Sequence, residues 1–282
     1  MDDRPRKQPK LAPRQKQIYE NYQVFSKEGV LLFRCNQKRL EWYHSRGLAQ
    51  YIDDKSIRLN FETKGTGRAG DEFYLEDQEN ICVVCGGINK LSLHHVVPDM
   101  YRRHMPECIK SRSSFDLLPL CLNCHDEYEK FAMQYKKSLV KKYLAPLEGT
   151  GWTLYPENRP VSRAAAALIK SRDKIPPSRI LELEGIVMAW WNQTHENTNL
   201  ITDSILDLAA QLVDREKSEQ YKEHGKIVVD QLMECSSVTN ECRERWPDLE
   251  VFIMSWRQHF LQHARPRYLS DNWSVEQSIY NR

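Results

Sequence analysis

The spacing of apolar and polar residues predicts strands and one short helix in the first third of the chain. Residues 56–63 (SIRLNFET) alternate with a period of two, as a half-buried strand does. Residues 29–35 (GVLLFRC) are also predicted to be a strand, and residues 37–47 a short helix that ends at Gly47. Residues 72–75 (EFYL) follow a glycine-rich turn, so we expect them to form a hairpin with 56–63.

The middle of the chain predicts two strands followed by a long helix. Residues 91–97 (LSLHHVV) form an apolar run that Pro98 stops, and residues 111–120 (SRSSFDLLPL) lead back along it. A helix is predicted from Cys124 to about Leu144, because its apolar residues recur on one helical face: Tyr128, Phe131, Ala132, Tyr135 and Leu139. The order strand, strand, helix is a ββα arrangement.

The remainder of the chain is predicted to be mostly helical. Helices are expected over residues 156–169, from Pro176 to Trp191, over residues 198–223 and after Pro247. The last helix has an apolar stripe typical of a core-facing surface: Leu249, Phe252, Ile253, Trp256 and Phe260. The pattern favours an α+β protein with a basic leader expected to be disordered (1–16), a small α+β region (17–80), a ββα region (81–145) and a helical C-terminal domain (146–282).

Composition limits the class of protein but does not identify its function. The chain has 282 residues, of which 40% are hydrophobic and 28% charged, an ordinary globular mixture. No apolar run approaches the roughly 20 residues that span a bilayer, so we expect no membrane segment. The leader is basic and lacks a secretory apolar core, which leaves a solvated tail, a backbone-contacting arm or a targeting segment as its role. The net charge of +2 is too small to indicate nucleic acid by itself.

Four of the eight cysteines form two CxxC pairs, Cys82 with Cys85 and Cys121 with Cys124. A CxxC turn supplies two thiolates to one tetrahedral zinc ion, and two such turns close its coordination sphere. We therefore predict a structural zinc site, with four unrelated buried cysteines or a redox pair as the alternatives. A long, charged chain without a secretory signal indicates a reducing, intracellular compartment, with nucleus, cytoplasm and mitochondrion left open.

Polar residues between the two cysteine pairs suggest chemistry. His94 and His95 lie on a predicted strand, so their side chains point to opposite faces, and one can bind a metal while the other faces a substrate. Asp116 lies five residues before Cys121, and His125 directly follows Cys124. The alternative for His125 is a helix-start residue that packs on the zinc loop.

At these positions the sequence resembles the HNH, or ββα-metal, endonucleases. The matching segments are CVVC, HHVVP and DLLPLCLNCH. The resemblance implies that His95 is the general base and that His94 and His125 hold one divalent ion, Mg²⁺ or Mn²⁺. Asp116 stands where the family usually has Asn, and its carboxylate could be a third ligand. An imidazole can take a proton from water near neutral pH, and the ion would stabilise charge on the phosphate.

Basic residues lie near the predicted site and could neutralise phosphates of DNA or RNA. We expect Arg102, Arg103, Lys110 and Arg112 to contact nucleic acid. A second basic set is equally well explained as the solvated face of the long helix: Lys130, Lys136, Lys137, Lys141 and Lys142.

A longer set of segments resembles the C-terminal half of the 3′–5′ exonuclease domain-containing protein 2 family. These segments are NICVVCG, VVPDMYRRHMP, DLLPLCLNCH and WRQHFLQHARPRYLSDNWSVEQ. The resemblance covers residues 18 to 277 with gaps and implies a role in DNA repair or RNA handling. No strand expected in the first 80 residues carries the acidic D-x-E motif of the family's exonuclease domain, so exonuclease activity is not inferred.

The sequence leaves three hypotheses for the function. The first is an HNH-type endonuclease that cleaves phosphodiester bonds with one divalent ion and the His95 base. The second is a non-catalytic, zinc-structured module that binds nucleic acid or a protein. The third is a structural scaffold for a separately encoded exonuclease partner. The pairing of the histidines favours the first hypothesis, and Asp116 in place of Asn counts against it.

Overall fold

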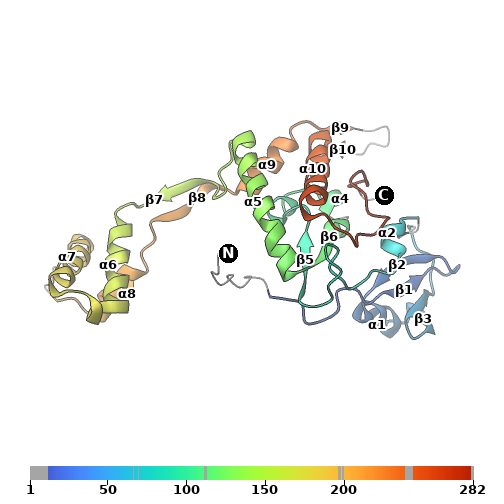
Figure 1. The fold of residues 1–282 in the computed structure, drawn as a ribbon, viewed down its shortest axis with the longest axis horizontal. Helices are drawn as coiled ribbons and strands as arrows, with labels where there is room; N and C mark the ends of the chain where they lie inside the picture. Colours follow the sequence, from blue (N-terminus) through green and yellow to red (C-terminus); the bar gives the residue numbers. More distant parts are fainter. Residues whose placement is uncertain are drawn as a thin grey trace, which may run out of the picture. The chain divides into compact units, whose positions relative to one another are not determined.

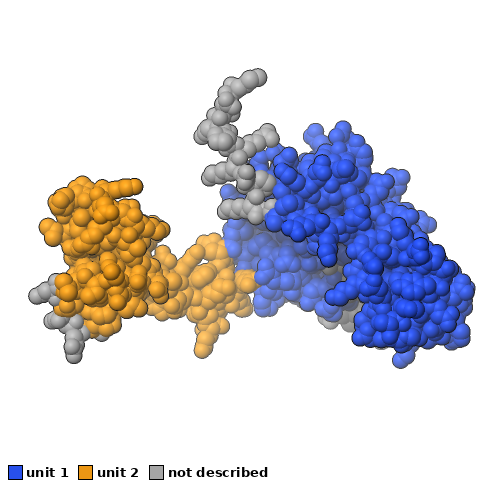
Figure 2. Space-filling model, turned by 90° about the horizontal axis from the view of Figure 1, so that it is seen from below, with its two compact units in different colours: residues 1–147, 224–282 blue, residues 148–223 orange. Residues whose placement is uncertain are grey.

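The computed structural model of the chain describes residues 12–65, 67–68, 70–110, 113–195, 198, 200–238 and 244–280. They form two compact units: Met1–Leu147 with His224–Arg282 (unit 1) and Glu148–Glu223 (unit 2), coloured blue and orange in Figure 2. The mixture of helices and strands confirms the predicted α+β class. The segment predicted as one helical domain (146–282) is divided between the two units. The predicted boundaries at residues 16, 80 and 145 stay a prediction, and residues 1–11 of the predicted leader lie outside the described part of the chain.

A four-stranded sheet opens unit 1, in the strand order β2-β1-β4-β3. Its members are β1 (Tyr22–Phe25), β2 (Leu31–Cys35), β3 (Ala49–Asp53) and β4 (Ser56–Leu59). Helix α1 (Gln37–Ser45) follows β2, and the Asn36 side chain caps it by accepting from the Arg39 amide. A small core forms between sheet and helix from Val24, Leu32, Leu40, Ala49, Ile57 and Leu59.

The predicted hairpin between residues 56–63 and 72–75 is wrong. Strand β4 pairs in parallel with β1 on one side and antiparallel with β3 on the other, so neither of its edges is open to a further strand. Residues Glu72–Leu75 instead form a single helical turn, α2, with Phe73 buried. The local pattern of four residues could not distinguish these outcomes, because the sheet order depends on pairing between distant segments.

The two strands and the long helix of the middle region occur in the predicted order. Strand β5 (Leu91–His95) pairs antiparallel with β6 (Leu117–Cys121), and His94 lies opposite Leu118. Helix α5 (Leu122–Tyr143) begins directly after β6 and lies beside the hairpin in Figure 1. Three short turns connect the strands: α3 (Asp99–Arg102), α4 (Glu107–Lys110) and η1 (Ser113–Asp116).

Unit 1 is completed by the last part of the chain. Helix α9 (His224–Leu232) packs against α3 and α5, and helix α10 (Pro247–Ala264) packs against α5 and α9. Two short strands, β9 (Ser237–Val238) and β10 (Glu244–Arg245), form an antiparallel pair. The predicted stripe of α10 is buried in the main core: Leu249, Phe252, Ile253, Trp256 and Phe260.

The segment after α10 returns to the cysteine loop and β6. The Tyr268 amide donates to the Val83 carbonyl at 2.9 Å. The Trp273 indole stacks on Phe115 with ring centroids 5.6 Å apart, and its Nε1 donates to the Phe115 carbonyl at 3.0 Å. These contacts fasten residues that are far apart in the sequence to the frame of the ββα region.

The described residues of unit 2 form three helices and a two-stranded ribbon. Its helices are α6 (Asn158–Ser171), which runs into the 3₁₀ turn η2 (Arg172–Lys174), α7 (Pro177–Thr194) and α8 (Asp203–Ala210). Strand β7 (Thr150–Leu154) pairs antiparallel with β8 (Arg215–Lys222). The core of the helices comprises Val161, Ala164, Ala165, Leu168, Leu183, Val187, Ile205, Leu206 and Ala209.

The prediction of one helix over residues 198–223 is wrong. Thr202 caps α8 by accepting from the Ile205 amide, and α8 ends after a little over two turns. Residues 215–222 (REKSEQYK) include several residue types with high helix propensity, yet they form a strand. Pairing with β7, more than 60 residues earlier in the sequence, overrides this local preference.

Candidate metal centres

The four predicted zinc cysteines converge in unit 1. One sulfur from each of Cys82, Cys85, Cys121 and Cys124 lies within 4.8 Å of the others. The Sγ atoms of Cys85 and Cys121 are 3.8 Å apart. Four thiolates at about 2.3 Å from a tetrahedral zinc ion lie about 3.8 Å from one another, so the sulfurs are spaced as zinc would require.

The first cysteine turn is built by backbone hydrogen bonds. The Cys82 amide donates to the Gly87 carbonyl and the Gly86 amide donates to the Cys82 carbonyl, both at 2.8 Å. Gly86 has φ +75°, a conformation that favours glycine, and a Cβ there would meet the Tyr268 ring at 2.8 Å. The Gly87 amide lowers the pKa of the exposed Cys85 thiol, whereas burial raises that of Cys82.

A second cluster joins strand β5 to the start of helix α5. His94 Nδ1 lies 3.1 Å from His125 Nε2, and the rings are perpendicular with centroids 4.7 Å apart. Both histidines are buried, with 2% and 6% of their surfaces exposed. The His94 Nε2 atom is also buried and has no hydrogen-bond partner among the residues that the structure describes. The structure thus brings together two of the three predicted ligands of the divalent ion.

Hydrogen bonding fixes which nitrogen of His125 has the lone pair. Ser92 Oγ donates its hydrogen to the Leu120 carbonyl at 3.1 Å, so toward His125 Nδ1, 2.8 Å away, it acts as the acceptor. His125 therefore has its proton on Nδ1 and its lone pair on Nε2, the atom that faces His94. An imidazole oriented in this way by a neighbouring acceptor is typical of metal-ligating histidines.

Glu129 is the third member of this cluster, and the sequence did not predict it. Its Oε1 atom lies 3.8 Å from both His94 Nδ1 and His125 Nε2, and a ligand atom from each residue falls within 4.8 Å of the others. Its Oε2 atom lies 3.4 Å from Nζ of Lys136, whose side chain is only 12% exposed. Glu129 is four residues after His125, on the same face of α5, and this spacing could have identified it.

Burial keeps the two histidines of the cluster neutral. It lowers the pKa of His94 well below the ordinary value, and the neighbouring His125 lowers it further. Burial also lowers the pKa of His125, although the Glu129 carboxylate opposes this effect. A neutral imidazole has one lone pair, which a metal ion requires; that of His125 accepts the Nδ1 proton of His94, a hydrogen bond that a bound ion would replace.

His95 points to the opposite face of β5, as the alternation of a strand predicts. Its Nε2 atom lies 3.0 Å from Nη2 of Arg102. A guanidinium can only donate, so His95 has its lone pair on Nε2 and its proton on Nδ1. Burial lowers the pKa of His95, Arg102 adds to this effect, and Asp99 opposes it.

Asp116 does not join the histidine cluster, so its predicted role as a ligand needs correction. Its carboxylate receives two hydrogen bonds from Arg257, at 2.8 Å from Nε and 3.0 Å from Nη2. Asp116 is 7% and Arg257 1% exposed, and Nη1 of the arginine also donates to the Val275 and Gln277 carbonyls. Both carboxylate oxygens are used in this buried pair, which joins η1, directly before β6, to α10 and to the returning segment.

Of the predicted nucleic-acid contacts that the structure describes, Arg102 lies in α3, Arg103 directly after it and Lys110 in α4. Arg102 and Arg103 both contact the Asp99 carboxylate, at 3.4 and 3.6 Å, and Lys110 lies 3.3 Å from the glutamate three residues before it. Arg112 lies outside the described residues. The contact of these side chains with nucleic acid stays a prediction.

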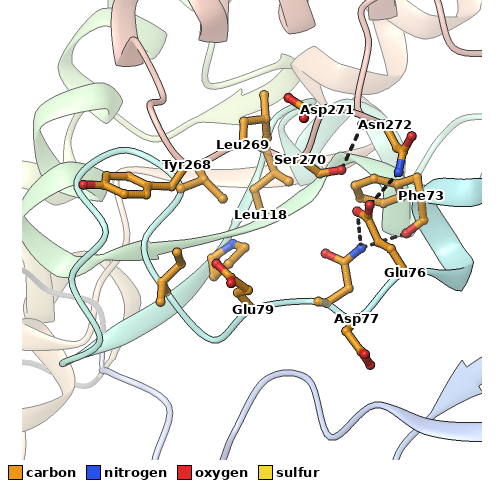
Figure 3. Close-up of a pocket in the computed structure, with 14 residues that line it drawn as sticks. Phe73, Glu76, Asp77, Glu79, Leu118, Tyr268, Leu269, Ser270, Asp271 and Asn272 are labelled. Carbon is orange, nitrogen blue, oxygen red and sulfur yellow. Dashed lines mark hydrogen bonds between the residues drawn. The ribbon is translucent and has the colours of Figure 1, made fainter.

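A pocket of about 380 Å³ lies between α2, β6 and the segment after α10 (Figure 3). Phe73, Leu118 and Leu269 line it with apolar surface, and its rim includes four acidic residues: Glu76, Asp77, Glu79 and Asp271. The Glu76 carboxylate accepts from Asn272 Nδ2 at 2.6 Å and from Gln78 Nε2 at 3.0 Å. An acidic rim repels phosphate, so we do not assign nucleic acid to this pocket.

Comparison with known proteins relates nearly the whole chain to part of longer proteins. It is 30% identical over 270 residues to "Exonuclease 3'-5' domain-containing protein 2" of Homo sapiens, which is 94% of this chain and 41% of that protein. The Drosophila melanogaster protein of the same name is 31% identical over 281 residues, 96% of this chain and 46% of that protein. "Protein RRP6-like 3" of Arabidopsis thaliana is 32% identical over 191 residues, 59% of this chain and 21% of that protein.

The chain spans less than half the length of these relatives. No protein-family model matches the chain, and no solved structure matches it. Within the described residues, no helix is both long and apolar enough to cross a membrane. Because no family model or solved structure matches, the resemblance to HNH endonucleases stays a prediction.

Proposed function

Homology over about 94% of the chain supports its place in the exonuclease 3'-5' domain-containing protein 2 family, and on that premise we propose that the chain acts on nucleic acid. The name of these relatives includes a 3'-5' exonuclease domain. We propose for this part of the protein a metal-dependent hydrolysis of phosphodiester bonds in DNA or RNA, performed by the ββα region of unit 1. The observation that supports it best is the convergence of His94, His125 and Glu129.

Zinc is the metal ion that we propose for the four cysteines. The donor set is all sulfur, its spacing fits a tetrahedral ion, and no fifth candidate ligand belongs to the group within the described residues. A closed sphere leaves no position for a reacting water, so the proposed role is structural. The ion would hold the cysteine turn against the start of α5, directly beside His125.

Mg²⁺ or Mn²⁺ is the ion that we propose His94, His125 and Glu129 to bind. Two ligand atoms on adjacent corners of an octahedron, each about 2.1 Å from the ion, lie about 3.0 Å apart. The two histidine nitrogens match this at 3.1 Å, and the Glu129 oxygen at 3.8 Å needs a shift of under about 1 Å. Two imidazoles beside one carboxylate favour Mn²⁺ over the harder Mg²⁺. The bound cation would stabilise negative charge on the phosphate and on the leaving oxygen.

His95 is the proposed base, and Arg102 its positioning partner. Its lowered pKa keeps the imidazole neutral at pH 7, and the contact with Arg102 puts the lone pair on Nε2. Movement of the Arg102 guanidinium onto a bound phosphate would free that lone pair to accept a proton from water. Arg102 would then hold the substrate by the same group that orients the base.

The test is cleavage of plasmid DNA, single-stranded DNA and RNA with Mn²⁺ by the zinc-loaded protein. We expect activity in the wild type and its loss in His95→Ala, His125→Ala and Glu129→Ala. The matched control is Glu127→Ala, on the same helix, where an exposed carboxylate pairs with Lys130. Activity that survives in His125→Ala, or that is absent from the wild type with every substrate, would refute the proposed reaction.

Two observations favour a second candidate, a zinc-structured module that binds nucleic acid or a protein without cleaving. The Nε2 lone pair of His95 is occupied by Arg102, and the family's usual Asn position holds a structural aspartate. Such a module would bind nucleic acid equally well with and without Mn²⁺, and His95→Ala would leave this binding unchanged.

A further inference from the structure

Helix α1 presents a row of cationic and aromatic side chains that the proposed reaction does not use. Lys38 and Trp42 are four residues apart on one face of the helix, and Arg46, the residue that caps its C-terminal end, reaches back over Trp42. Arg39 lies beside this row, three residues before Trp42. We name Lys38, Arg39, Trp42 and Arg46 the α1 stripe.

Trp42, the aromatic residue of the stripe, belongs to a continuous series of ring contacts. The Arg46 guanidinium lies over the Trp42 ring at 4.4 Å, and the Trp42 and Tyr43 rings are 5.0 Å apart. Tyr43 is 6.3 Å from Phe33 of strand β2, and the Arg39 guanidinium lies over Phe33 at 4.7 Å. Two arginine–aromatic pairs thus flank the central tyrosine.

Trp42 is the large aromatic residue of α1 that faces solvent, with 45% of its surface exposed. The hydrophobic core beneath α1 is filled by Leu40 on the opposite face, which is 1% exposed. Trp42 therefore adds little to that core. An exposed indole beside cations offers a flat surface on which a ligand ring can stack.

The charge on the stripe has one sign. The only acidic residue of α1 is Glu41, which lies three residues after Lys38 at the edge of the stripe and accepts a hydrogen bond from Gln37 Nε2 at 2.8 Å. A surface that combines cations with exposed aromatic rings matches the phosphates and bases of an unpaired strand. Paired bases would not expose their faces to Trp42, so a duplex fits this surface poorly.

We propose that the α1 stripe binds single-stranded nucleic acid by stacking a base on Trp42, with Lys38, Arg39 and Arg46 contacting the phosphates. This assignment rests on the proposed action on nucleic acid, and it names the substrate as an unpaired strand. The four-stranded sheet region is then a binding platform in the same unit as the candidate cation centre. The stripe needs no metal ion, so binding and cleavage can be measured separately.

The test is the affinity of the full chain for a fluorescent oligouridylate of about 20 nucleotides, measured by anisotropy without added Mn²⁺. Trp42→Ala is expected to weaken binding at least about fivefold, and Trp42→Phe to restore most of it. Arg46→Ala should lower the slope of log affinity against log salt by about 0.7. The control is Tyr51→Ala, because Tyr51 is 46% exposed and contacts His44, away from the stripe.

The possible outcomes separate this inference from the proposed reaction. Equal affinities of Trp42→Ala and the wild type, or an equal loss in Tyr51→Ala, would overturn the stripe even if Mn²⁺-dependent cleavage is observed. Binding that depends on Trp42 in a protein without cleavage would support the stripe and refute the reaction. Absence of binding to any nucleic acid by the wild type would refute both.

Discussion

Asp116→Ala should lower the free energy of unfolding of the protein without removing a ligand of the divalent ion. The substitution leaves Arg257, which is 1% exposed, as a charge without its carboxylate partner inside the core of unit 1. Loss of one partner from a buried, hydrogen-bonded pair costs about 3–5 kcal/mol. This is a large part of the roughly 5–15 kcal/mol that stabilises a folded domain.

Urea unfolding monitored by tryptophan fluorescence measures this loss. The surface pair of Arg34 with Asp77, whose side chain is 74% exposed, provides the control, and Asp77→Ala should cost under about 1 kcal/mol. The double substitution Asp116→Leu with Arg257→Met removes both charges, so we expect it to be more stable than Asp116→Ala. A folded Asp116→Asn protein with wild-type stability and no affinity for Mn²⁺ would refute the reasoning, because Asp116 would then be a ligand.

Three further predictions concern other parts of the structure. Cys124→Ser should lose bound zinc, as measured by metal analysis. The ββα region should then unfold, because the free energy of zinc binding contributes directly to its folding. Unchanged zinc content would contradict the assignment. Gly225→Ala should lower the free energy of unfolding by about 3 kcal/mol, since its Cβ would lie 1.7 Å from the Met100 carbonyl oxygen, and unchanged stability would show that this close approach is absent. Burial, with His263 adding to it, lowers the pKa of His259 to about 4, so the folded protein holds the ring neutral while the unfolded chain takes up a proton near pH 6.5. Its contribution to stability is therefore complete above about pH 6.5 and lost as the pH falls toward 4, and unfolding of His259→Gln should vary less with pH over this range than that of the wild type.

Local pattern predicted the parts of the candidate site that lie close in sequence. Strand β6 leads directly into α5, so the register of β5 with β6 is enough to bring His94 near His125. The alternation of β5 likewise sends His95 to the other face. Glu129 could have been predicted by the same reasoning, because a residue four positions after a helical ligand shares its face.

Contacts between distant segments could not be predicted from the pattern. Arg257 is 141 residues after Asp116, and nothing local marks it as the partner of that carboxylate. The prediction for Asp116 followed its position in a motif, whereas the fold of α10 decides where its charge is neutralised. The helix predicted over residues 198–223 failed for a similar reason, since the distant strand β7 determines the conformation of residues 215–222.

Titration of the zinc-loaded protein with Mn²⁺, followed by calorimetry, tests the central claim most directly. We expect the wild type and Asp116→Asn to bind one Mn²⁺ ion, and His125→Ala and Glu129→Ala to bind none. Ser92→Ala should bind it roughly 10 to 100 times more weakly, because the acceptor that orients His125 is lost. A wild type without affinity for Mn²⁺, or unchanged affinity in His125→Ala, would contradict a divalent-ion centre at these residues.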